Sequence, residues 1–282
     1  MKIFFPVGRL GNHIFQYFYV LSKTSKNEII ITSYSEFFNT FECNDRIVIK
    51  IPKYVRYFVR KFFYLLRDYN LIGRIYQNEL IIDGHLYHDT TVTESNGLLS
   101  KIHSIDDGYY MANSFFSPEI IDNTKIKKKY LDDAFSFIND IDKNKKKIFV
   151  HIRRTDYKVW GVLGNTDSTL PLSYYKDNIE FFSKKYDCLF IFLGDDYNYM
   201  KEKFDYIDNK IISRNSASTD LAIMTICDGG ILSPSTFAFW GANLMQNSCE
   251  IIAPKYWLGF RDKIWYPLGI ENKKFIYKEI IE

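Results

Sequence analysis

Two adjacent arginines follow an apolar segment in the middle of the chain. Residues 147–152 (KIFVHI) predict a buried strand, and Arg153, Arg154 and Asp156 come directly after it. The carboxyl ends of parallel strands are where open α/β sheets bind ligands, and guanidinium groups pair well with phosphate oxygens. Asp156 could orient one guanidinium, while His151 is either a core histidine or a contact to a base. The pattern favours a diphosphate site over its alternative, a solvated salt-bridge cluster.

A second candidate anion site lies later in the same half of the chain. Residues 229–232 predict a strand, and Ser235 and Thr236 precede a helix predicted over residues 237–245. Hydroxyl groups and free N–H groups at a helix N-terminus bind anions, although the same residues also serve as ordinary caps. Both candidate sites fall at one edge of the predicted sheet.

The N-terminus has the order strand, glycine turn, helix. Residues 2–7 (KIFFPV) predict the strand, residues 8–13 (GRLGNH) the turn, and residues 14–22 the helix. Glycines let backbone N–H groups approach an anion, and Arg9 and Asn12 add side-chain donors. An ordinary turn between a strand and a helix is the alternative interpretation.

Repeated strand and helix patterns position these residues and indicate an α/β fold with parallel sheets. The first half is less regular: residues 80–82 and 109–116 predict two short strands with aromatic loops. Residues 126–144, rich in Lys and Asp, predict a helix and an exposed linker, so we place a domain boundary after residue 143. The other predicted strands are residues 28–32, 46–51, 188–193, 210–212 and 249–253.

Composition and local sequence patterns exclude several kinds of binding partner and location. The net charge of +3 is small, and the basic runs at residues 125–129 and 143–147 have no interleaved aromatic residues, so we expect no nucleic-acid partner. No apolar run approaches the ~20 residues of a spanning helix, so we expect a cytoplasmic protein. The four cysteines fit no metal-binding spacing and are expected to be reduced and buried: Cys43, Cys188, Cys227 and Cys249.

Residues 54–67 predict an amphipathic helix with two interpretations. It either packs on the core with a solvated basic face or contacts an anionic bilayer at the inner face of the cytoplasmic membrane. The residues at core spacing are Val55, Phe58, Val59, Phe62 and Leu66, and those of the basic face are Arg56, Arg60 and Arg67.

Together, these motifs resemble the bacterial α1,2-fucosyltransferases of glycosyltransferase family 11. The resemblance rests on residues 8–17 (GRLGNHIFQY), 151–157 (HIRRTDY), 192–196 (FLGDD), 218–227 (STDLAIMTIC) and 235–241 (STFAFWG). The matches keep their order over nearly the whole chain. This sequence departs from the family at His13, where Gln is usual, and at residues 228–230.

The resemblance implies a GT-B-like enzyme with two Rossmann-type domains facing a cleft. Residues 1–143 would form the acceptor side, and residues 144–282 would bind the GDP-sugar, with a C-terminal tail crossing back. The implied reaction is an inverting transfer of L-fucose from GDP-L-fucose, without metal or other cofactor. It would form an α1,2 linkage to an oligosaccharide or lipid-linked glycan in O-antigen or surface polysaccharide synthesis. A donor with another 6-deoxyhexose, such as colitose, and a catalytically silent nucleotide-sugar-binding module are the alternatives.

The resemblance also assigns roles to residues. His151 and Asp220 would hold the guanine, Arg154 would grip the diphosphate, and Asp167 is the nearest candidate for the general base. Asp167 could equally cap the following turn through Ser168 and Thr169. The predicted donor-binding residues are Gly11, His151, Arg153, Asp156, Tyr175, Asp220, Ser235 and Thr236, and the predicted catalytic residues are Asn12, Arg154 and Asp167.

One acidic pair is not expected to bind a metal. Asp195 and Asp196 follow a strand, and adjacent residues there point to opposite faces. We expect them to cap or orient a loop instead.

Overall fold

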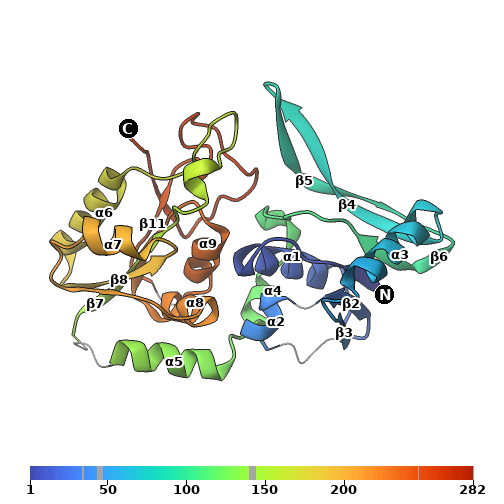
Figure 1. Ribbon diagram of the computed structural model, residues 1–282, viewed down its shortest axis with the longest axis horizontal. Coiled ribbons are helices and arrows are strands. Elements are labelled where there is room, and N and C mark those ends of the chain that lie inside the picture. Colours follow the sequence, from blue (N-terminus) through green and yellow to red (C-terminus); the bar gives the residue numbers. More distant parts are fainter. Residues whose placement is uncertain (34, 43–46, 140–143, 247, 282) are drawn as a thin grey trace. The chain divides into compact units, whose positions relative to one another are not determined.

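Two six-stranded sheets organise the chain, one in each of two compact units, and most of their neighbouring strands are parallel. The structure is a computed structural model that describes residues 1–33, 35–42, 47–139, 144–246 and 248–281 (Figure 1). Unit 1 comprises Met1–Lys127 with Leu268–Glu271, and unit 2 comprises Lys128–Pro267 with Asn272–Glu282. The predicted boundary after residue 143 adjoins residues 140–143, which lie outside the described residues.

Unit 1 contains a six-stranded sheet in the order β3-β2-β1-β6-β4-β5. β5 runs antiparallel to β4, and the other neighbouring strands are parallel. Its strands are β1 (Lys2–Phe4), β2 (Ile29–Ser33), β3 (Ile47–Ile51), β4 (Ile72–Ile82), β5 (His85–Ser95) and β6 (Leu99–Ile105). Its helices are α1 (Leu10–Ser22), α2 (Glu36–Thr40), α3 (Arg56–Asp68), η1 (Asn113–Phe115) and α4 (Pro118–Asn123).

Both faces of β1 are covered, because side chains alternate along a strand. Ile3 belongs to a cluster with Val59, Phe63 and Leu66 of α3. Phe4 points to the other face, where its ring meets Tyr17 of α1 edge-on at 6.0 Å. Such two-sided burial explains why Ile3 and Phe4 are both apolar, although they face opposite sides of the sheet.

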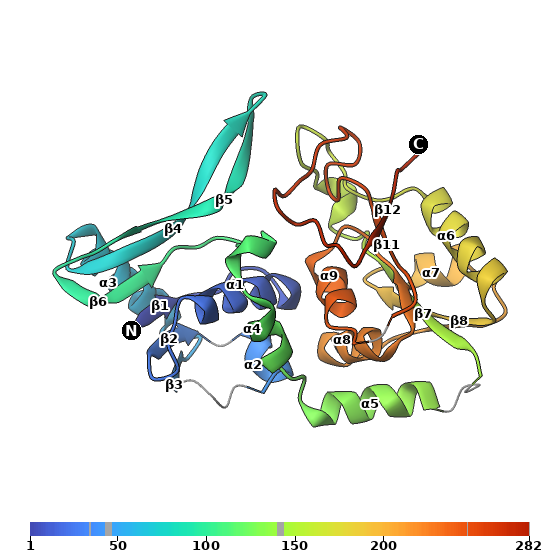
Figure 2. The ribbon, with the colours of Figure 1, turned by 180° about the vertical axis from the view of Figure 1, so that it is seen from behind.

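A long hairpin, β4–β5, extends beyond the rest of the unit 1 sheet (Figures 1 and 2). Asp83 and Gly84 form its two-residue turn with φ values of 50° and 78°, as a type I′ turn requires. The short strand predicted over residues 80–82 is thus the end of a strand of 11 residues. The strand predicted over residues 109–116 is wrong, because this segment is a loop containing η1.

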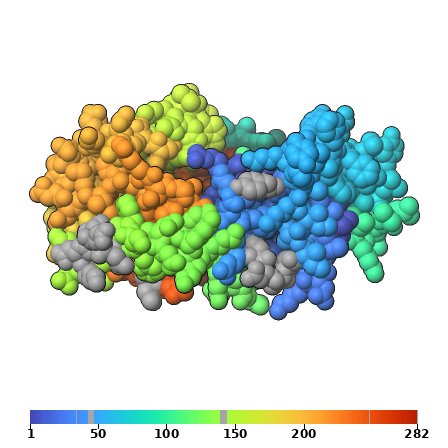
Figure 3. Space-filling view, turned by 60° about the horizontal axis from the view of Figure 1, so that its bottom comes forward, coloured from blue at the N-terminus to red at the C-terminus, as the bar shows by residue number. Residues whose placement is uncertain are grey.

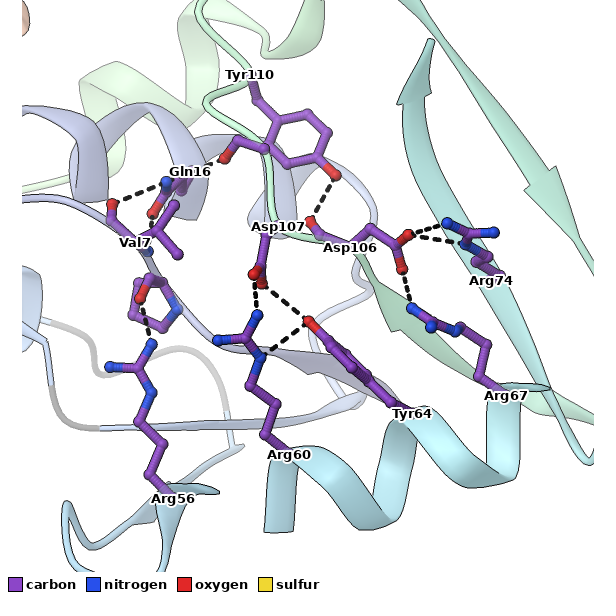
Figure 4. Close-up of polar contacts among 12 residues, drawn as sticks. Val7, Gln16, Arg56, Arg60, Tyr64, Arg67, Arg74, Asp106, Asp107 and Tyr110 are labelled. Atoms are coloured by element: carbon purple, nitrogen blue, oxygen red, sulfur yellow. Dashed lines mark hydrogen bonds and ion pairs between the residues drawn. The ribbon is translucent and has the colours of Figure 1, made fainter. Parts of the chain in front are cut away.

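The predicted orientation of α3 is correct only in part: Val59 and Leu66 pack against the core as expected, but other residues do not. Phe58 and Phe62, expected in the core, are 70% and 54% exposed, and Figure 3 shows the light blue α3 on the surface of unit 1. The arginines, expected on a solvated face, instead bond to the body of the unit (Figure 4). Arg67 Nη1 lies 2.8 Å from Asp106, Arg60 pairs with Asp107, and Arg56 donates to the Pro6 carbonyl at 2.6 Å.

The cause is the loop after β6, whose two aspartates attract the arginines inward. The loop is distant from α3 in the chain, so helical periodicity alone could not reveal it. In the part of the chain that the structure describes, no helix is long and apolar enough to cross a membrane.

Unit 2 contains a fully parallel six-stranded sheet in the order β12-β11-β10-β7-β8-β9. Its strands are β7 (Lys146–Ile152), β8 (Cys188–Gly194), β9 (Lys210–Ile212), β10 (Gly229–Ile231), β11 (Ile251–Pro254) and β12 (Ile276–Lys278). Its helices are α5 (Lys128–Asn139), η2 (Tyr157–Val159), α6 (Leu172–Lys185), α7 (Tyr197–Lys203), α8 (Ala217–Ile226) and α9 (Thr236–Asn243).

The central strand of unit 2 is buried on both faces. Residues 148–152 of β7 are at most 3% exposed. Ile148, Val150 and Ile152 pack in one cluster with Ile179 and Phe182 of α6. Consecutive strands joined through helices bring all their carboxyl ends to one edge.

The cysteine prediction holds in part. Cys188 and Cys227 are free and buried, whereas Cys249 is free and exposed, because it lies in the turn before β11 rather than in a strand. Cys43 lies outside the described residues.

Candidate active site

The carboxyl edge of the unit 2 sheet gathers polar residues from four neighbouring strands. Arg153 and Arg154 follow β7, Asp195 follows β8, Ser213 follows β9, and Ser233 follows β10. Ile152 pairs with Gly194, so the loops after β7 and β8 start side by side. The predicted common edge is therefore present.

Asp195 organises the arginine loop. Its Oδ1 accepts the backbone N–H of Arg154 at 2.8 Å, and its Oδ2 accepts the Thr155 hydroxyl at 2.6 Å. Asp196 caps α7 by accepting the N–H of Tyr199 at 3.2 Å. The expectation that this acidic pair orients a loop and caps a helix is confirmed.

Arg153 is held by two carboxylates. Its Nη2 donates to Asp156 Oδ2 at 2.5 Å, and its Nε lies 3.2 Å from Asp195 Oδ2. Asp156 does hold a guanidinium, as predicted. These contacts occupy donors of Arg153 and make it part of the frame of the site.

Arg154 differs from Arg153 in how its donors are used. Its guanidinium lies over the ring of Tyr199, 3.9 Å from the centroid, and its Nε is 3.8 Å from Asp196 Oδ2. That Nε is buried and has no hydrogen-bond partner among the described residues. The same holds for the buried hydroxyl of Tyr175, whose charge interactions include Arg154. Unpaired buried donors are costly, so they mark a place for an acceptor.

His151 ties β7 to the loop after β10. Its Nδ1 lies 2.7 Å from Ser233 Oγ, and burial lowers its pKa to about 3, so the ring is neutral at pH 7. Tyr157 bridges the same loops by donating to the Pro234 carbonyl at 3.0 Å. These bonds fix the arginine loop against the start of α9.

Asp220 lies in the first turn of α8. Ser213 Oγ donates to its Oδ1 at 2.5 Å. Burial raises the pKa of Asp220 to about 7, and the Ser213 hydrogen bond opposes part of that rise. Asp220 is therefore partly protonated near neutral pH.

Ser235 is the N-cap of α9. Its side chain accepts the N–H of Phe237 at 3.3 Å, and Thr236 is the first residue of the helix. Ser235 therefore caps α9, which is one of the two predicted interpretations. The N-terminus of α9 lies at the same sheet edge as the arginine loop.

Asp167 makes the contacts of a turn cap. Its Oδ1 accepts the N–H and hydroxyl of Thr169 at 2.8 and 2.7 Å, and Arg261 donates to its carbonyl at 2.7 Å. Burial acts to raise the pKa of Asp167, but the Thr169 hydrogen bonds and the charges of Arg261 and Arg154 outweigh it and lower that pKa. The interaction with Arg154 brings Asp167 into the same electrostatic environment as the arginine loop.

In unit 1, the glycine turn is tightly packed. Gly8 has φ 85°, and a Cβ there would lie 2.4 Å from Asn12 Nδ2. The N–H of Leu10 donates to Glu36 Oε2 at 2.7 Å, so a carboxylate of the unit itself occupies part of the α1 N-terminus. Gly11 is buried within α1, and burial lowers the pKa of His13.

Sequence reasoning missed three residues that build these sites: Tyr199, Ser233 and Glu36. An aromatic residue three positions after the capping Asp196, and the first hydroxyl after β10, are the signals for the first two. Glu36 carries no local signal, because it is distant from Leu10 in the chain. Among the residues that the structure describes, no three His, Cys, Asp or Glu side chains gather as a metal-ligand group.

Comparison with known proteins identifies the family. Residues 116–261, more than half of the chain, match the family described as Glycosyl transferase family 11. The chain belongs to glycosyltransferase family 11. The matched residues of this family 11 chain include both arginines, Asp195, Asp220 and the start of α9, and the chain is a glycosyltransferase.

Two relatives of this family 11 chain come from Escherichia coli. The O-antigen biosynthesis glycosyltransferase WbnK is 24% identical over 295 aligned residues, covering 91% of this chain and 94% of that protein. An alpha-1,2-colitosyltransferase is 28% identical over 127 residues, covering 43% of this chain and 44% of that protein.

A solved structure supports the fold. The fucosyltransferase NodZ from Bradyrhizobium matches with a TM-score of 0.53 and 11% identity, covering 86% of this chain and 92% of that one. The family 11 chain thus has the α/β, GT-B-like fold that the sequence predicted.

Proposed function

We propose that this family 11 enzyme transfers L-fucose from GDP-L-fucose to a sugar hydroxyl, forming an α1,2 linkage in O-antigen or surface polysaccharide synthesis. The acceptor is an oligosaccharide or a lipid-linked glycan. WbnK, an O-antigen biosynthesis glycosyltransferase that is similar to this chain over nearly its whole length, supports a role in this process. NodZ has been crystallised with GDP, which supports a guanosine diphosphate donor.

The observation that carries the proposal is that a buried N–H donor of Arg154 has no acceptor among the described residues. Its guanidinium is held at the sheet edge while its Nε lacks a hydrogen-bond partner among the described residues. A diphosphate would accept these N–H groups in the plane of the guanidinium. As the sugar bond breaks, negative charge grows on the departing GDP, and Arg154 with the N-terminus of α9 would stabilise it. Such preorganised donors supply a large part of catalysis in a buried site.

The guanine would be held by Asp220 and His151. A carboxylate can accept the two neighbouring N–H donors of guanine, so we propose that the deprotonated form of Asp220 binds the base. His151 would contribute as a neutral ring, because its pKa is about 3. Gly11, Arg153, Asp156, Tyr175, Ser235 and Thr236 remain proposed donor-binding residues.

For the acceptor, we propose Asp167 as the general base and Asn12 as a polar contact near the reacting groups. Asp167 Oδ1 accepts two hydrogen bonds from Thr169, so Oδ2 is the oxygen that would accept the proton of the acceptor hydroxyl. Asp167→Asn should lower transfer by ~100-fold or more with GDP affinity unchanged. Thr169→Val is the matched control: it removes a hydroxyl donor to the cap and should leave transfer within a few-fold. Equal losses in both variants would assign Asp167 to capping alone.

We also propose peripheral membrane contact through residues 54–67, but by a different face from the one predicted. The arginines are paired inward, so the contact would be made by exposed aromatic residues such as Tyr57 and Phe58, with exposed Lys61 among them. Phe58→Ser/Phe62→Ser should weaken co-sedimentation with phosphatidylglycerol vesicles, whereas Ile281→Ser, at a residue 84% exposed, should not. Equal binding by all three proteins would contradict the contact.

A second donor is favoured by one finding. The alignment with the colitosyltransferase covers 43% of this chain, so GDP-colitose is the alternative 6-deoxyhexose donor. A catalytically silent nucleotide-sugar-binding module is the other alternative, and the buried Nε of Arg154, which has no hydrogen-bond partner among the described residues, argues against it.

The test is a panel of nucleotide sugars incubated with the purified chain. We expect GDP-L-fucose to be hydrolysed or transferred faster than GDP-mannose, UDP-galactose and UDP-N-acetylglucosamine. Faster turnover of GDP-colitose would identify colitose as the transferred sugar and would still support a GDP-sugar donor. Preference for a UDP-sugar would contradict the proposal, and GDP binding without turnover of any donor would indicate the silent module.

A further inference from the structure

The two arginines of the loop after β7 are held by different chemistry. Arg153 is held by two carboxylates: Asp156 accepts its Nη2–H at 2.5 Å, and Asp195 forms an ion pair with its Nε at 3.2 Å. Arg154 is held by the ring of Tyr199, 3.9 Å from its guanidinium carbon, and its contact to a carboxylate is a longer ion pair, 3.8 Å from Nε to Asp196 Oδ2, without a hydrogen bond. A carboxylate uses the in-plane donors of a guanidinium and neutralises its charge, whereas an aromatic face attracts the cation and leaves those donors free.

The position of Tyr199 is itself fixed by the site. Tyr199 lies in the first turn of α7, and Asp196 at the N-cap accepts its backbone N–H at 3.2 Å. The backbone of Arg154 is fixed separately, because its N–H donates to Asp195 at 2.8 Å. The adjacent residues Asp195 and Asp196 thus fix the two partners of the stack. Asp195 binds the backbone of Arg154, and Asp196 binds the backbone of Tyr199.

We infer that Tyr199 is a positioning residue for the reaction: it holds the Arg154 guanidinium so that its in-plane donors face the diphosphate of the donor. The inference rests on the proposed function, since it assumes that Arg154 binds a diphosphate. Tyr199 acts through Arg154 and need not touch the substrate. Its ring, rather than its hydroxyl, does the positioning.

The same helix offers a matched control. Tyr197 also stacks on an arginine, with the guanidinium carbon of Arg214 3.7 Å from its ring centroid. Arg214 follows β9, and its side chain is exposed. Tyr197→Leu therefore removes an equivalent stack on α7 without changing the contact to Arg154.

The experiment compares Tyr199→Leu, Tyr199→Phe and Tyr197→Leu in steady-state turnover of GDP-L-fucose and in calorimetric binding of GDP and guanosine. Removing the ring in Tyr199→Leu should lower kcat by ~10-fold or more, because an unheld guanidinium samples other rotamers before each turnover. GDP affinity should fall while guanosine affinity is unchanged, and Tyr199→Phe should restore both kcat and GDP affinity. Tyr197→Leu should resemble the wild type.

A double variant separates positioning from general structural damage. In an Arg154→Ala background, Tyr199→Leu should cause little further loss, because two residues that act as one unit are not additive. An additive further loss, a kcat of Tyr199→Leu equal to that of the wild type, or equal losses of GDP and guanosine affinity would overturn the inference. Failure of the wild type to bind GDP would instead contradict the proposed function.

Discussion

Asp195 Oδ1 accepts the backbone N–H of Arg154 at 2.8 Å, which joins the end of β8 to the loop after β7. The second oxygen of the same carboxylate accepts the Thr155 hydroxyl at 2.6 Å. The direction in which Arg154 leaves the sheet is therefore set by a residue on the neighbouring strand.

Asp195→Ala should weaken GDP binding by ~10-fold or more, because the arginine loop loses the acceptor for three of its donors. Calorimetric titration with GDP measures the loss. Asp205→Ala, at a carboxylate that is 85% exposed, is the control and should bind GDP normally. Wild-type affinity in Asp195→Ala would refute the organising role of this carboxylate.

The free energy of unfolding should respond to pH in opposite directions at His151 and Asp220. The pKa of His151 is lowered to about 3, so its contribution is present above pH 6.5 and is lost as pH falls toward 3. The pKa of Asp220 is raised to about 7, so its contribution is present below pH 3.8 and is lost as pH rises through 7. The two effects oppose each other between about pH 4 and 6.5.

Removing either group should therefore leave the pH dependence of stability that is due to the other. Relative to the wild type, Asp220→Asn should gain stability with rising pH, and His151→Gln should lose it, each by at most ~1.4 kcal/mol per pH unit. Denaturant unfolding followed by tryptophan fluorescence at pH 4.5, 5.5 and 6.5 provides the measurement. Curves that stay parallel to the wild type would contradict the assignment.

Transfer should persist in excess EDTA. Asp195 and Asp196 use their oxygens for the arginine loop and the α7 cap, which leaves positive charge at the site to come from Arg154 and the α9 N-terminus. Initial rates with EDTA, and with EDTA followed by Mg²⁺ or Mn²⁺, provide the measurement. Complete loss on chelation that is restored by either cation would contradict metal-independent transfer.

Gly8→Ala should lower transfer by ~10-fold or more while leaving GDP affinity unchanged. The added Cβ would lie 2.4 Å from Asn12 Nδ2, so the Asn12 side chain must move. Gly84→Ala is the matched control: it carries the same strain at φ 78°, but its Cβ would meet no described atom within 4 Å. Both variants should lose stability by ~1 kcal/mol, and equal transfer rates would exclude a role for the Gly8 and Asn12 packing.

The parallel sheet of unit 2 could be predicted from the sequence because its determinants are local. Residues 148–152 are apolar except for His151, and polar residues follow each strand, so the shared carboxyl edge follows from the parallel order. The hairpin of unit 1 also carried a local signal, Asp83-Gly84, which indicates a two-residue turn between strands. The turn signal marks where the two strands meet and does not define how far β4 and β5 extend.

Other features depend on partners distant in the chain. Periodicity could not show that Asp106 and Asp107 turn the α3 arginines inward, nor that Glu36 reaches the N–H of Leu10. The stack of Arg154 on Tyr199 likewise requires the three-dimensional arrangement of β7 and α7. Local sequence thus predicted which residues gather at the edge and the roles of the nearby aspartates, but not how Arg154 is held.

The most direct measurement of the central claim is the turnover of GDP-L-fucose by Arg154→Ala and Arg154→Lys beside the wild type. Removing a donor to a developing phosphate anion should lower kcat by ~100-fold or more, and lysine should fail as well, because a point charge cannot replace the planar fork. Unchanged thermal unfolding would confirm that both variants are folded. Wild-type turnover by either variant would contradict the account.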